Sequence, residues 1–288
     1  MRILVTGADG MLGHAVTARL AGAHAVRGVD LVDGDLADAA VARRIVDDAA
    51  PEWIVHCAAW TDVDGAEASR DEAMRANAEA TAHLAALCAG RGAGLTYIST
   101  DYVFDGRGER GGYDEDDPRA PLNHYGLSKA RGEEAVEALG VPWQIVRTSW
   151  LFGDGRVNFV KTIARLLGER ETLQVVDDQV GSPTYAGDLA AVLDFLVSSG
   201  RRGIFHGTNA GACSWHAFAC EIARRTGHDP ARVHPCASTA FPRPAPRPAC
   251  SVLRSRRLEE AGCPARPAWQ DALGRYLDLL ASGRARCP

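Results

Sequence analysis

Gly7-Ala8-Asp9-Gly10-Met11-Leu12-Gly13 is the stretch of this sequence that decides the fold. It directly follows the short apolar run Arg2–Thr6, which we expect to be a strand, and it leads into a helix-forming run from Leu12 to Leu20. A glycine-rich turn between a strand and a helix offers free backbone N–H groups and the positive end of a helix dipole to a pyrophosphate. The spacing alone also fits an ordinary structural turn, but its place between a strand and a helix favours dinucleotide binding.

The rest of the first half alternates β-rich and helix-forming runs, which is typical of βαβ units in a parallel sheet. Further strands are expected at Ala25–Asp30, Trp53–His56, Gly94–Ser99 and Trp143–Arg147. Further helices are expected at Ala37–Ala50, Arg70–Gly90 and Tyr125–Leu139. The pattern predicts an α/β fold with a Rossmann-type doubly wound parallel sheet, in which ligands bind at the carboxyl ends of the strands.

After residue 150 the alternation weakens, and helices are expected at 158–168, 186–199, 214–226 and 269–280. We therefore expect a dinucleotide-binding domain over residues 1–150 and a smaller, interleaved C-terminal substrate lobe over residues 151–288, with some segments returning to the first domain. The segment Cys236–Cys250 carries a proline at every second position from Pro242 to Pro248, which forbids a helix. It is interpreted either as a surface linker or as a strap that closes over a ligand.

Composition excludes several classes of protein. The 288 residues carry a net charge of −5, which gives no general attraction to nucleic acid or to anionic lipid. No apolar run reaches the length of a signal peptide or a membrane span, so a cytoplasmic protein without nucleic-acid or membrane partners is expected. The eight cysteines form no Cys-x-x-Cys pair and no zinc-ligand spacing, and they are interpreted as reduced thiols without a metal.

An acidic residue ends the second expected strand. Asp30 lies where a carboxylate would accept hydrogen bonds from the adenosine ribose and would repel a 2′-phosphate, which favours NADH. A solvated acid at a strand end is the alternative, and the nearby Arg27 leaves NADPH open. Asp35 and Leu36 follow closely and are expected to meet the adenine.

Tyr125 and Lys129 form a Tyr-x-x-x-Lys pair, and positions four apart share one face of a helix. Only two of the 32 basic residues are lysines, so a lysine at this position is notable. An ammonium beside a phenol favours the phenolate, and we expect Lys129 to lower the pKa of Tyr125. Thr100, at the end of the fourth expected strand, can hold a substrate carbonyl against that phenol. An exposed helical pair without a function is the alternative.

Longer strings carry a resemblance to a known family. They are AAWTDVDGAE (58–67), STDYVFDG (99–106), PLNHYGLSKARGE (121–133), RTSWLFG (147–153), DDQVGSPT (177–184), CSWHAFA (213–219) and PRPAPRPACSVL (242–253). Together with the glycine motif, they make the chain resemble the dTDP-4-dehydrorhamnose reductase family of extended short-chain dehydrogenases/reductases. The resemblance implies reduction of the C4 ketone of a dTDP-4-keto-6-deoxy-L-hexose by NADH or NADPH, giving dTDP-L-rhamnose.

The resemblance also implies roles for single residues. The catalytic residues would be Thr100, Tyr125 and Lys129. The cofactor would be bound by Gly7, Gly10, Met11, Leu12, Gly13, Asp30, Asp35, Leu36, Ala59, Trp60, Thr61, Ile98, Tyr125 and Lys129. The dTDP-sugar would be bound by Thr100, Asp101 and Trp150, although a tryptophan at position 150 would more often be a core residue.

Two positions depart from the family pattern. Trp60 stands where relatives commonly have Tyr or His, and this changes the nicotinamide side of the pocket. Ala15 stands where some relatives have a glutamate of a magnesium site at a dimer interface. We therefore expect no metal and a monomer or a weak homodimer.

Three other functions remain open. A dehydratase of the same superfamily would need a glutamate after Asp101, where this chain has Tyr102. A 4-ketoreductase for another activated deoxysugar fits the same residues. A non-catalytic regulatory subunit of the same fold is disfavoured because Thr100, Tyr125 and Lys129 are all present.

Overall fold

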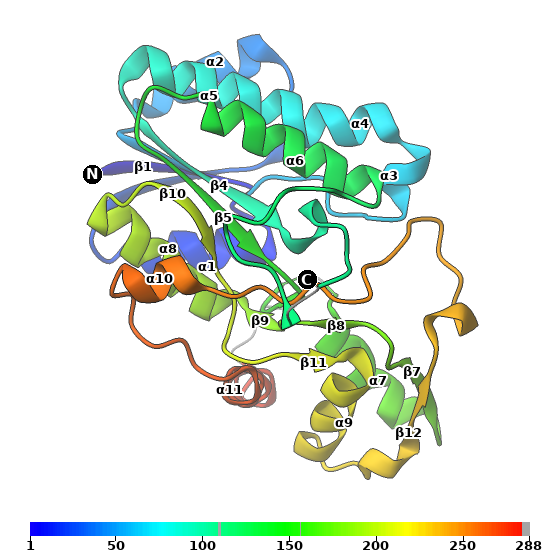
Figure 1. Cartoon of the computed structure of the whole chain (residues 1–288). Helices are drawn as coiled ribbons and strands as arrows, with labels where there is room; N and C mark the ends of the chain where they lie inside the picture. Colours follow the sequence, from blue (N-terminus) through cyan, green and yellow to red (C-terminus); the bar gives the residue numbers. More distant parts are fainter. Residues whose placement is uncertain (109–110, 156, 284–288) are drawn as a thin grey trace.

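The computed structural model, which describes residues 1–108, 111–155 and 157–283, is built around one six-stranded sheet (Figure 1). The strand order is β10-β5-β4-β3-β1-β2, and every neighbouring pair is parallel. The strands are β1 (Arg2–Thr6), β2 (Ala25–Val29), β3 (Trp53–His56), β4 (Gly94–Thr100), β5 (Trp143–Thr148) and β10 (Gly203–His206). The chain order reverses between β1 and β3, and this is where ligands bind in such sheets.

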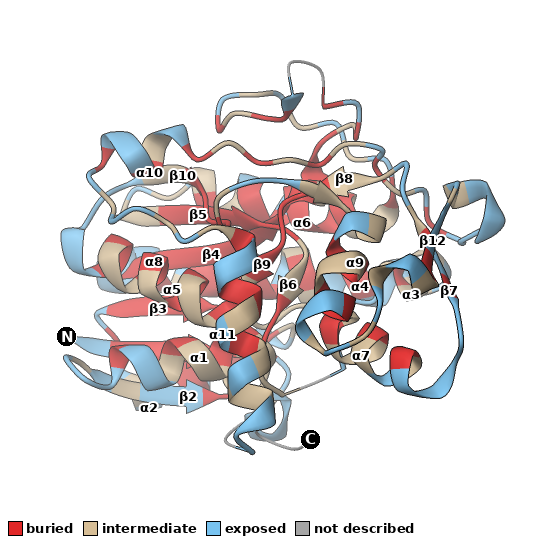
Figure 2. Cartoon of the chain, turned by 90° about the horizontal axis from the view of Figure 1, so that it is seen from below, coloured by how far each residue is buried: buried red, intermediate tan, exposed pale blue. Residues whose placement is uncertain are grey.

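Helices cover both faces of the sheet, as Figure 1 shows. One face carries α2 (Ala39–Ala49), α5 (Ala80–Arg91) and α6 (His124–Glu137), and the other carries α1 (Met11–Leu20) and α8 (Ala186–Ser199). Each face has its own apolar core against the strands; β1, β3, β4 and β5 are buried over most of their length, whereas the edge strand β2 is largely exposed (Figure 2). The predicted Rossmann-type α/β fold is confirmed.

Two differences from the expected elements have physical causes. The sixth strand, β10 (Gly203–His206), was not predicted; it is an edge strand that pairs with β5, almost 60 residues earlier in the chain. The helix expected at Arg70–Gly90 is divided into α4 (Arg70–Met74), a π-helical turn over Arg75–Glu79 and α5. Within that turn the carbonyl of Asn77 accepts hydrogen bonds from the Thr81 and Tyr97 hydroxyls at 2.7 and 3.2 Å. The Thr81 and Tyr97 hydroxyls thus compete with the backbone N–H that would bond the Asn77 carbonyl in a regular α-helix.

The second lobe packs around its own aromatic core. Its helices are α7 (Phe159–Glu169), α9 (Trp215–Arg225) and α11 (Trp269–Ala281). It also contains three two-stranded pairs: β6 (Leu151–Phe152) with β9 (Thr184–Tyr185), β7 (Leu173–Val176) with β12 (Val233–Cys236), and β8 (Val180–Gly181) with β11 (Cys213–Ser214). Phe152, Phe218 and Tyr276 are fully buried at its centre. The short helices α3 (Gly65–Ala68) and α10 (Arg256–Glu260) complete the chain.

In the described part of the chain no helix combines the length and the apolar character needed to cross a bilayer. Seven cysteines fall within it, and all are unpaired. Cys287 lies outside the described residues.

Candidate active site

The glycine motif forms a tight turn between β1 and α1. Gly7 has a φ of +66°, and a Cβ there would lie 2.6 Å from the backbone nitrogen of Ala58. A Cβ on Gly13 would lie 2.0 Å from the carbonyl oxygen of Gly7, so the start of α1 can approach the strand only without a side chain. Gly10 caps α1 with an extended backbone and no side-chain hydrogen bond. The first backbone N–H groups of α1 remain available to an anion, as a pyrophosphate site requires.

Asp30 lies beside this turn, at the end of β2. Its Oδ2 accepts a hydrogen bond from the backbone nitrogen of Asp9 at 2.8 Å, and its Oδ1 accepts one from the nitrogen of Leu31 at 2.8 Å. Asp33 accepts a hydrogen bond in return from the Asp30 nitrogen. The carboxylate is thereby fixed next to the glycine motif, where a ribose would meet it.

Asp35 and Leu36 are placed differently from each other. The Asp35 carboxylate pairs with Arg75 at 3.1 Å on the surface. The Leu36 side chain is only 9% exposed and belongs to the core under α2 and α5. The Leu36 carbonyl is 3.2 Å from His83 Nδ1, and the expected contact of Leu36 with an adenine stays a prediction.

The loop after β3 is held by a residue that the sequence did not single out. The Asn77 side chain accepts a hydrogen bond from the Trp60 nitrogen at 2.8 Å and donates to the Trp60 carbonyl at 3.1 Å. It also donates to Ser128 Oγ at 2.9 Å, one position before Lys129. Asn77 therefore ties the predicted cofactor loop Ala59-Trp60-Thr61 to α6. The interruption of a long helix by an asparagine offered only a weak signal.

Helix α6 presents Tyr125 and Lys129 toward the carboxyl edge of β4. Asn123 caps the helix by accepting a hydrogen bond from the Gly126 nitrogen at 2.8 Å, which fixes the turn that carries Tyr125. Lys129 is 3% exposed, and its Nζ lies 4.2 Å from the centre of the Tyr97 ring. The Thr100 hydroxyl lies close enough to Tyr125 to affect the pKa of its phenol, and Lys129 follows Tyr125 by one helical turn on α6, so the three predicted catalytic residues lie near one another.

The pKa values of Tyr125 and Lys129 are shifted in directions that the sequence did not predict. Burial raises the pKa of Tyr125 to about 12, against the opposing effect of the Thr100 hydroxyl. Burial lowers the pKa of Lys129 to about 7, although Glu133 opposes this change. Burial thus dominates both groups in the chain alone, and the expectation that Lys129, next to a cationic nicotinamide, lowers the pKa of Tyr125 stays a prediction. A phenol with a raised pKa keeps its proton at neutral pH, so it is ready to act as an acid.

Asp101 is the second buried acid at this edge. Its Oδ1 accepts a hydrogen bond from Thr100 Oγ1 at 3.1 Å, and the carboxyl is 2% exposed. Burial raises the pKa of Asp101 to about 7, with the Ser251 and Thr100 hydroxyls working in the other direction. The predicted substrate contact is thus a carboxyl that can be neutral at physiological pH.

A buried ion pair fixes α6 on the sheet. Arg147, on β5, donates to both carboxylate oxygens of Glu133 at 2.9 and 2.7 Å, and the two side chains are 1% and 0% exposed. Burial alone would raise the pKa of Glu133, but the Arg147 guanidinium lowers it overall. Glu133 is one helical turn beyond Lys129, so this pair also helps to set the position of the α6 face that carries Tyr125 and Lys129.

Trp150 lies in the second lobe with a strained backbone. Its φ of +46° is rare for an aromatic residue, and such strain is concentrated at functional sites. One face of its indole stacks on Trp215 with ring centres 3.5 Å apart and an angle of 7°. The other face covers Gly181, where a Cβ would lie 2.4 Å from Trp150 Cε2. Trp215 was not predicted, because its partner is 65 residues away along the chain.

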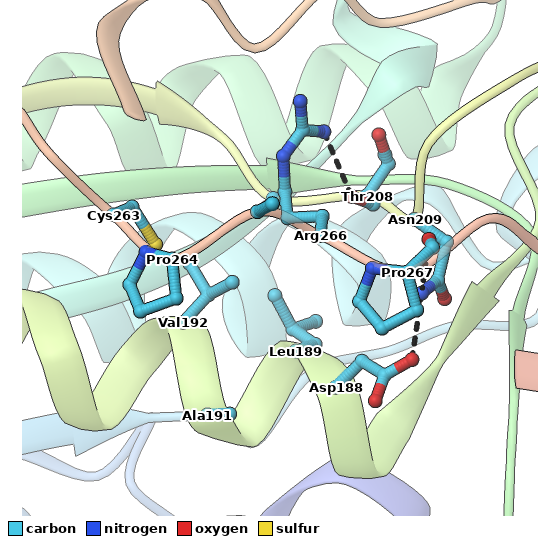
Figure 3. Close-up of a pocket in the computed structure, with 12 residues that line it drawn as sticks. Asp188, Leu189, Ala191, Val192, Thr208, Asn209, Cys263, Pro264, Arg266 and Pro267 are labelled. Atoms are coloured by element: carbon cyan, nitrogen blue, oxygen red, sulfur yellow. Dashed lines mark hydrogen bonds between the residues drawn. The ribbon is translucent and has the colours of Figure 1, made fainter. Parts of the chain in front are cut away.

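Two remaining features do not belong to this cluster. A pocket of about 180 Å³ lies between α8 and the segment Cys263–Pro267, and none of the predicted site residues lines it (Figure 3). Within the described ranges, no three His, Cys, Asp or Glu side chains are grouped as metal ligands. Ala15 packs against the core between α1 and the sheet.

Comparison with known proteins gives a consistent result. The model of the RmlD substrate binding domain family matches residues 1–282. A dTDP-4-dehydrorhamnose reductase of Streptomyces griseus is 45% identical, over 100% of this chain and 96% of that protein. A dTDP-4-keto-6-deoxy-D-glucose reductase of Streptomyces niveus is 42% identical over 97% of each. The solved dTDP-4-dehydrorhamnose reductase of Bacillus anthracis in complex with NADP has a TM-score of 0.92 and 39% identity, covering 96% of this chain and 98% of that one.

Proposed function

The chain belongs to the RmlD substrate binding domain family, and on that premise we propose that it reduces the C4 ketone of dTDP-4-dehydrorhamnose to give dTDP-L-rhamnose. It is an oxidoreductase that uses NADH or NADPH. The observation that carries the proposal is the cluster of Thr100, Tyr125 and Lys129 at the carboxyl edge of the sheet. The glycine turn after β1 opens at the same edge and has no room for side chains at Gly7 and Gly13.

The bound reduced nicotinamide supplies the hydride for C4. The residues of this chain supply the proton and the orientation. Tyr125 keeps its proton at neutral pH because burial raises its pKa, and it can donate that proton to the C4 oxygen as negative charge develops there. Thr100, whose hydroxyl lies near Tyr125, would hold the substrate carbonyl against that phenol. Lys129 lies on α6 one helical turn after Tyr125, where its amine would bond the cofactor ribose and, when protonated, would place a positive charge near the phenol.

The test is a direct assay. The protein is incubated with dTDP-4-dehydrorhamnose and either NADH or NADPH, and the product is identified by NMR. We expect oxidation of the cofactor in equal amount to a product that is dTDP-L-rhamnose. Absence of turnover with both cofactors would overturn the proposal, and a non-catalytic subunit would then be the better interpretation.

A second activity has support from a specific finding. The Streptomyces niveus relative is named as a reductase of dTDP-4-keto-6-deoxy-D-glucose and is nearly as similar as the rhamnose-forming relative. A 4-ketoreductase for another activated deoxysugar therefore remains the alternative. The same assay with that sugar decides between them by the ratio of kcat/KM.

Three further parts of the proposal concern the location of the protein, its division into domains, and its oligomeric state and metal requirement. We propose a cytoplasmic location, supported by the unpaired cysteines of the described residues. We propose that residues 1–150 form the cofactor domain and residues 151–288 mainly the sugar lobe, with α8 and β10 packed on the first sheet. A monomer or weak homodimer that needs no metal stays a prediction.

A further inference from the structure

The proline-rich segment Cys236–Cys250 is anchored to the catalytic half of the molecule at several points. The Ala245 nitrogen donates to Asp64 Oδ1 at 3.3 Å, and the Asn123 side chain donates to the Pro246 carbonyl at 2.9 Å. The Cys250 nitrogen donates to the Gly106 carbonyl at 2.8 Å. Ala245 and Pro248 are buried, so the segment is more than a surface linker. In Figure 1 this segment, coloured gold to orange, runs from β12 toward α3.

This segment brings two arginines to a single carboxylate. Arg247 lies 2.9 Å from Asp64 Oδ1, and Arg243 lies 3.7 Å from Asp64 Oδ2. The nearby Glu67 does not balance the second charge, because it pairs with Arg70 and accepts a hydrogen bond from the His124 nitrogen. The group formed by Asp64, Arg243 and Arg247 therefore carries one net positive charge. The Arg247 side chain is 20% exposed, so it is largely fixed by its surroundings, whereas Arg243 at 61% is free to move.

The arginines lie close to the catalytic tyrosine. The Arg247 guanidinium carbon is 6.0 Å from the centre of the Tyr102 ring, and Tyr102 packs edge-on against Tyr125 with ring centres 5.7 Å apart. The diphosphate of a nucleotide sugar is attached at C1, across a six-membered ring from C4. When C4 meets Tyr125, the diphosphate must lie at least one sugar ring away from the phenol, and Arg247 is linked to Tyr125 through their shared neighbour Tyr102.

We propose that Arg243 and Arg247 form the subsite for the diphosphate of the nucleotide-sugar substrate. Guanidinium groups suit this task because their planar donors bind phosphate oxygens in pairs. In the free protein, the Asp64 carboxylate pairs with Arg247 and holds it in position. The diphosphate would replace this carboxylate as the partner of Arg247. The inference rests on the proposed function, since it assumes that the substrate carries a diphosphate. The cofactor pyrophosphate is assigned separately, to the glycine turn between β1 and α1.

The asparagine anchor gives this subsite a link to catalysis. Asn123 donates to Pro246 and at the same time caps α6, two residues before Tyr125. An anion bound by both arginines therefore changes the position of the proline-rich segment. Through Asn123, that segment contacts the first turn of α6, which carries Tyr125. The prolines limit how far that segment can bend.

The test measures binding by calorimetry, with dTDP, thymidine at higher concentration, and NADH as three separate ligands. We expect Arg247→Gln to weaken dTDP binding on the order of 10- to 100-fold, as for the loss of charge-assisted hydrogen bonds. Thymidine and NADH binding should not change. Arg256→Gln is the matched control, because Arg256 pairs with acids on the surface of α10 and should leave all three ligands unaffected.

Asp64→Asn separates a ligand site from a structural ion pair. If Arg247 and Asp64 only brace the segment, the two substitutions break the same contact and should weaken dTDP binding alike. If the arginines bind the diphosphate, removal of the competing carboxylate should tighten dTDP binding while Arg247→Gln weakens it. Asp64 makes no side-chain cap on α3, so this change leaves the helix intact.

The outcomes distinguish this inference from the proposed function. Equal losses in both variants, a parallel loss of thymidine and NADH binding in Arg247→Gln, or no binding of dTDP to the wild type would overturn the subsite. Selective loss of dTDP binding in a protein that reduces neither sugar would keep the subsite and overturn the activity.

Discussion

The two halves of the site are assembled in different ways. The proposed cofactor half consists of residues at or shortly after the ends of strands of one sheet: the glycine turn after β1, Asp30 after β2, Trp60 four residues after β3 and Thr100 at the end of β4. The sugar half is brought together from segments far apart in the chain, such as Trp150 with Trp215 and Asp64 with Arg247. The comparison shows that strand pairing within the sheet positions the residues of the cofactor half. Side-chain contacts between distant segments position those of the sugar half.

Helix α6 lies between the halves, and its Tyr125 is the group on which both depend. Tyr125→Phe removes the proposed acid but keeps the ring that packs against Tyr102. We expect kcat to fall about 10²- to 10⁴-fold, the usual range for a positioned general acid, with the melting temperature unchanged. Steady-state kinetics with either cofactor measure this.

Lys129→Arg is the companion variant to Tyr125→Phe. It keeps the charge but loses the compact ammonium in a site that is 3% exposed, and most of kcat should be lost with it. Turnover close to wild type in both variants, with NADH still bound, would show that the proton comes from another group.

The next largest effect concerns the buried pair that holds α6 on the sheet. Glu133→Gln leaves Arg147, which is 1% exposed, without its carboxylate. Removing one partner of a buried ion pair typically costs about 3–5 kcal/mol of unfolding free energy. Denaturant unfolding should show a loss of this size. The control is Glu134→Gln, whose exposed pair with Arg131 should contribute about 1 kcal/mol or less. Equal stability losses in the two variants would refute the structural role of the buried pair.

The two halves also differ in how much of their structure could be predicted from the sequence. The five strands β1 to β5 and the cluster of Thr100, Tyr125 and Lys129 were predictable, because local patterns in the chain encode them. The π-helical turn at Asn77, the strand β10 and the partner of Trp150 were not predictable. Each depends on contacts made only after the chain has folded, such as the Tyr97 hydroxyl on the Asn77 carbonyl. The effect of burial on the pKa of Tyr125 was not predictable either, since burial is a tertiary property.

Gly181→Ala tests whether the sugar half can be disturbed alone. A Cβ there would lie 2.4 Å from the Trp150 ring, so the stacked indoles must move. Overpacking of this kind costs about 1–3 kcal/mol, and we expect a raised KM for the sugar with an unchanged Kd for NADH.

The matched control for Gly181→Ala lies in the same lobe. At Gly168, on α7, a Cβ would meet nothing within 4 Å. Gly168→Ala should therefore be neutral or slightly stabilising. A loss of NADH affinity in Gly181→Ala would show that the two halves are coupled through Trp150.

The smallest expected effect is on the choice of cofactor. Asp30 is fixed by the nitrogens of Asp9 and Leu31 beside the glycine turn, where a carboxylate can accept from ribose hydroxyls and would repel a 2′-phosphate. We expect the wild type to use NADH at least as well as NADPH, although one relative was solved with NADP. Asp30→Ala should shift the ratio of kcat/KM toward NADPH by about tenfold, the scale of one charged hydrogen bond.

The control for Asp30→Ala is Asp33→Ala, because Asp33 accepts the hydrogen bond from the Asp30 nitrogen at 2.9 Å and so supports the same turn without facing the ribose. It should lower the use of both cofactors equally and leave their ratio unchanged. The ratio is the informative quantity, since loss of the bond to the Asp9 nitrogen in Asp30→Ala disturbs the glycine turn for either cofactor. A clear preference for NADPH in the wild type that persists in Asp30→Ala would mean that the strand-end acid serves only to shape the turn.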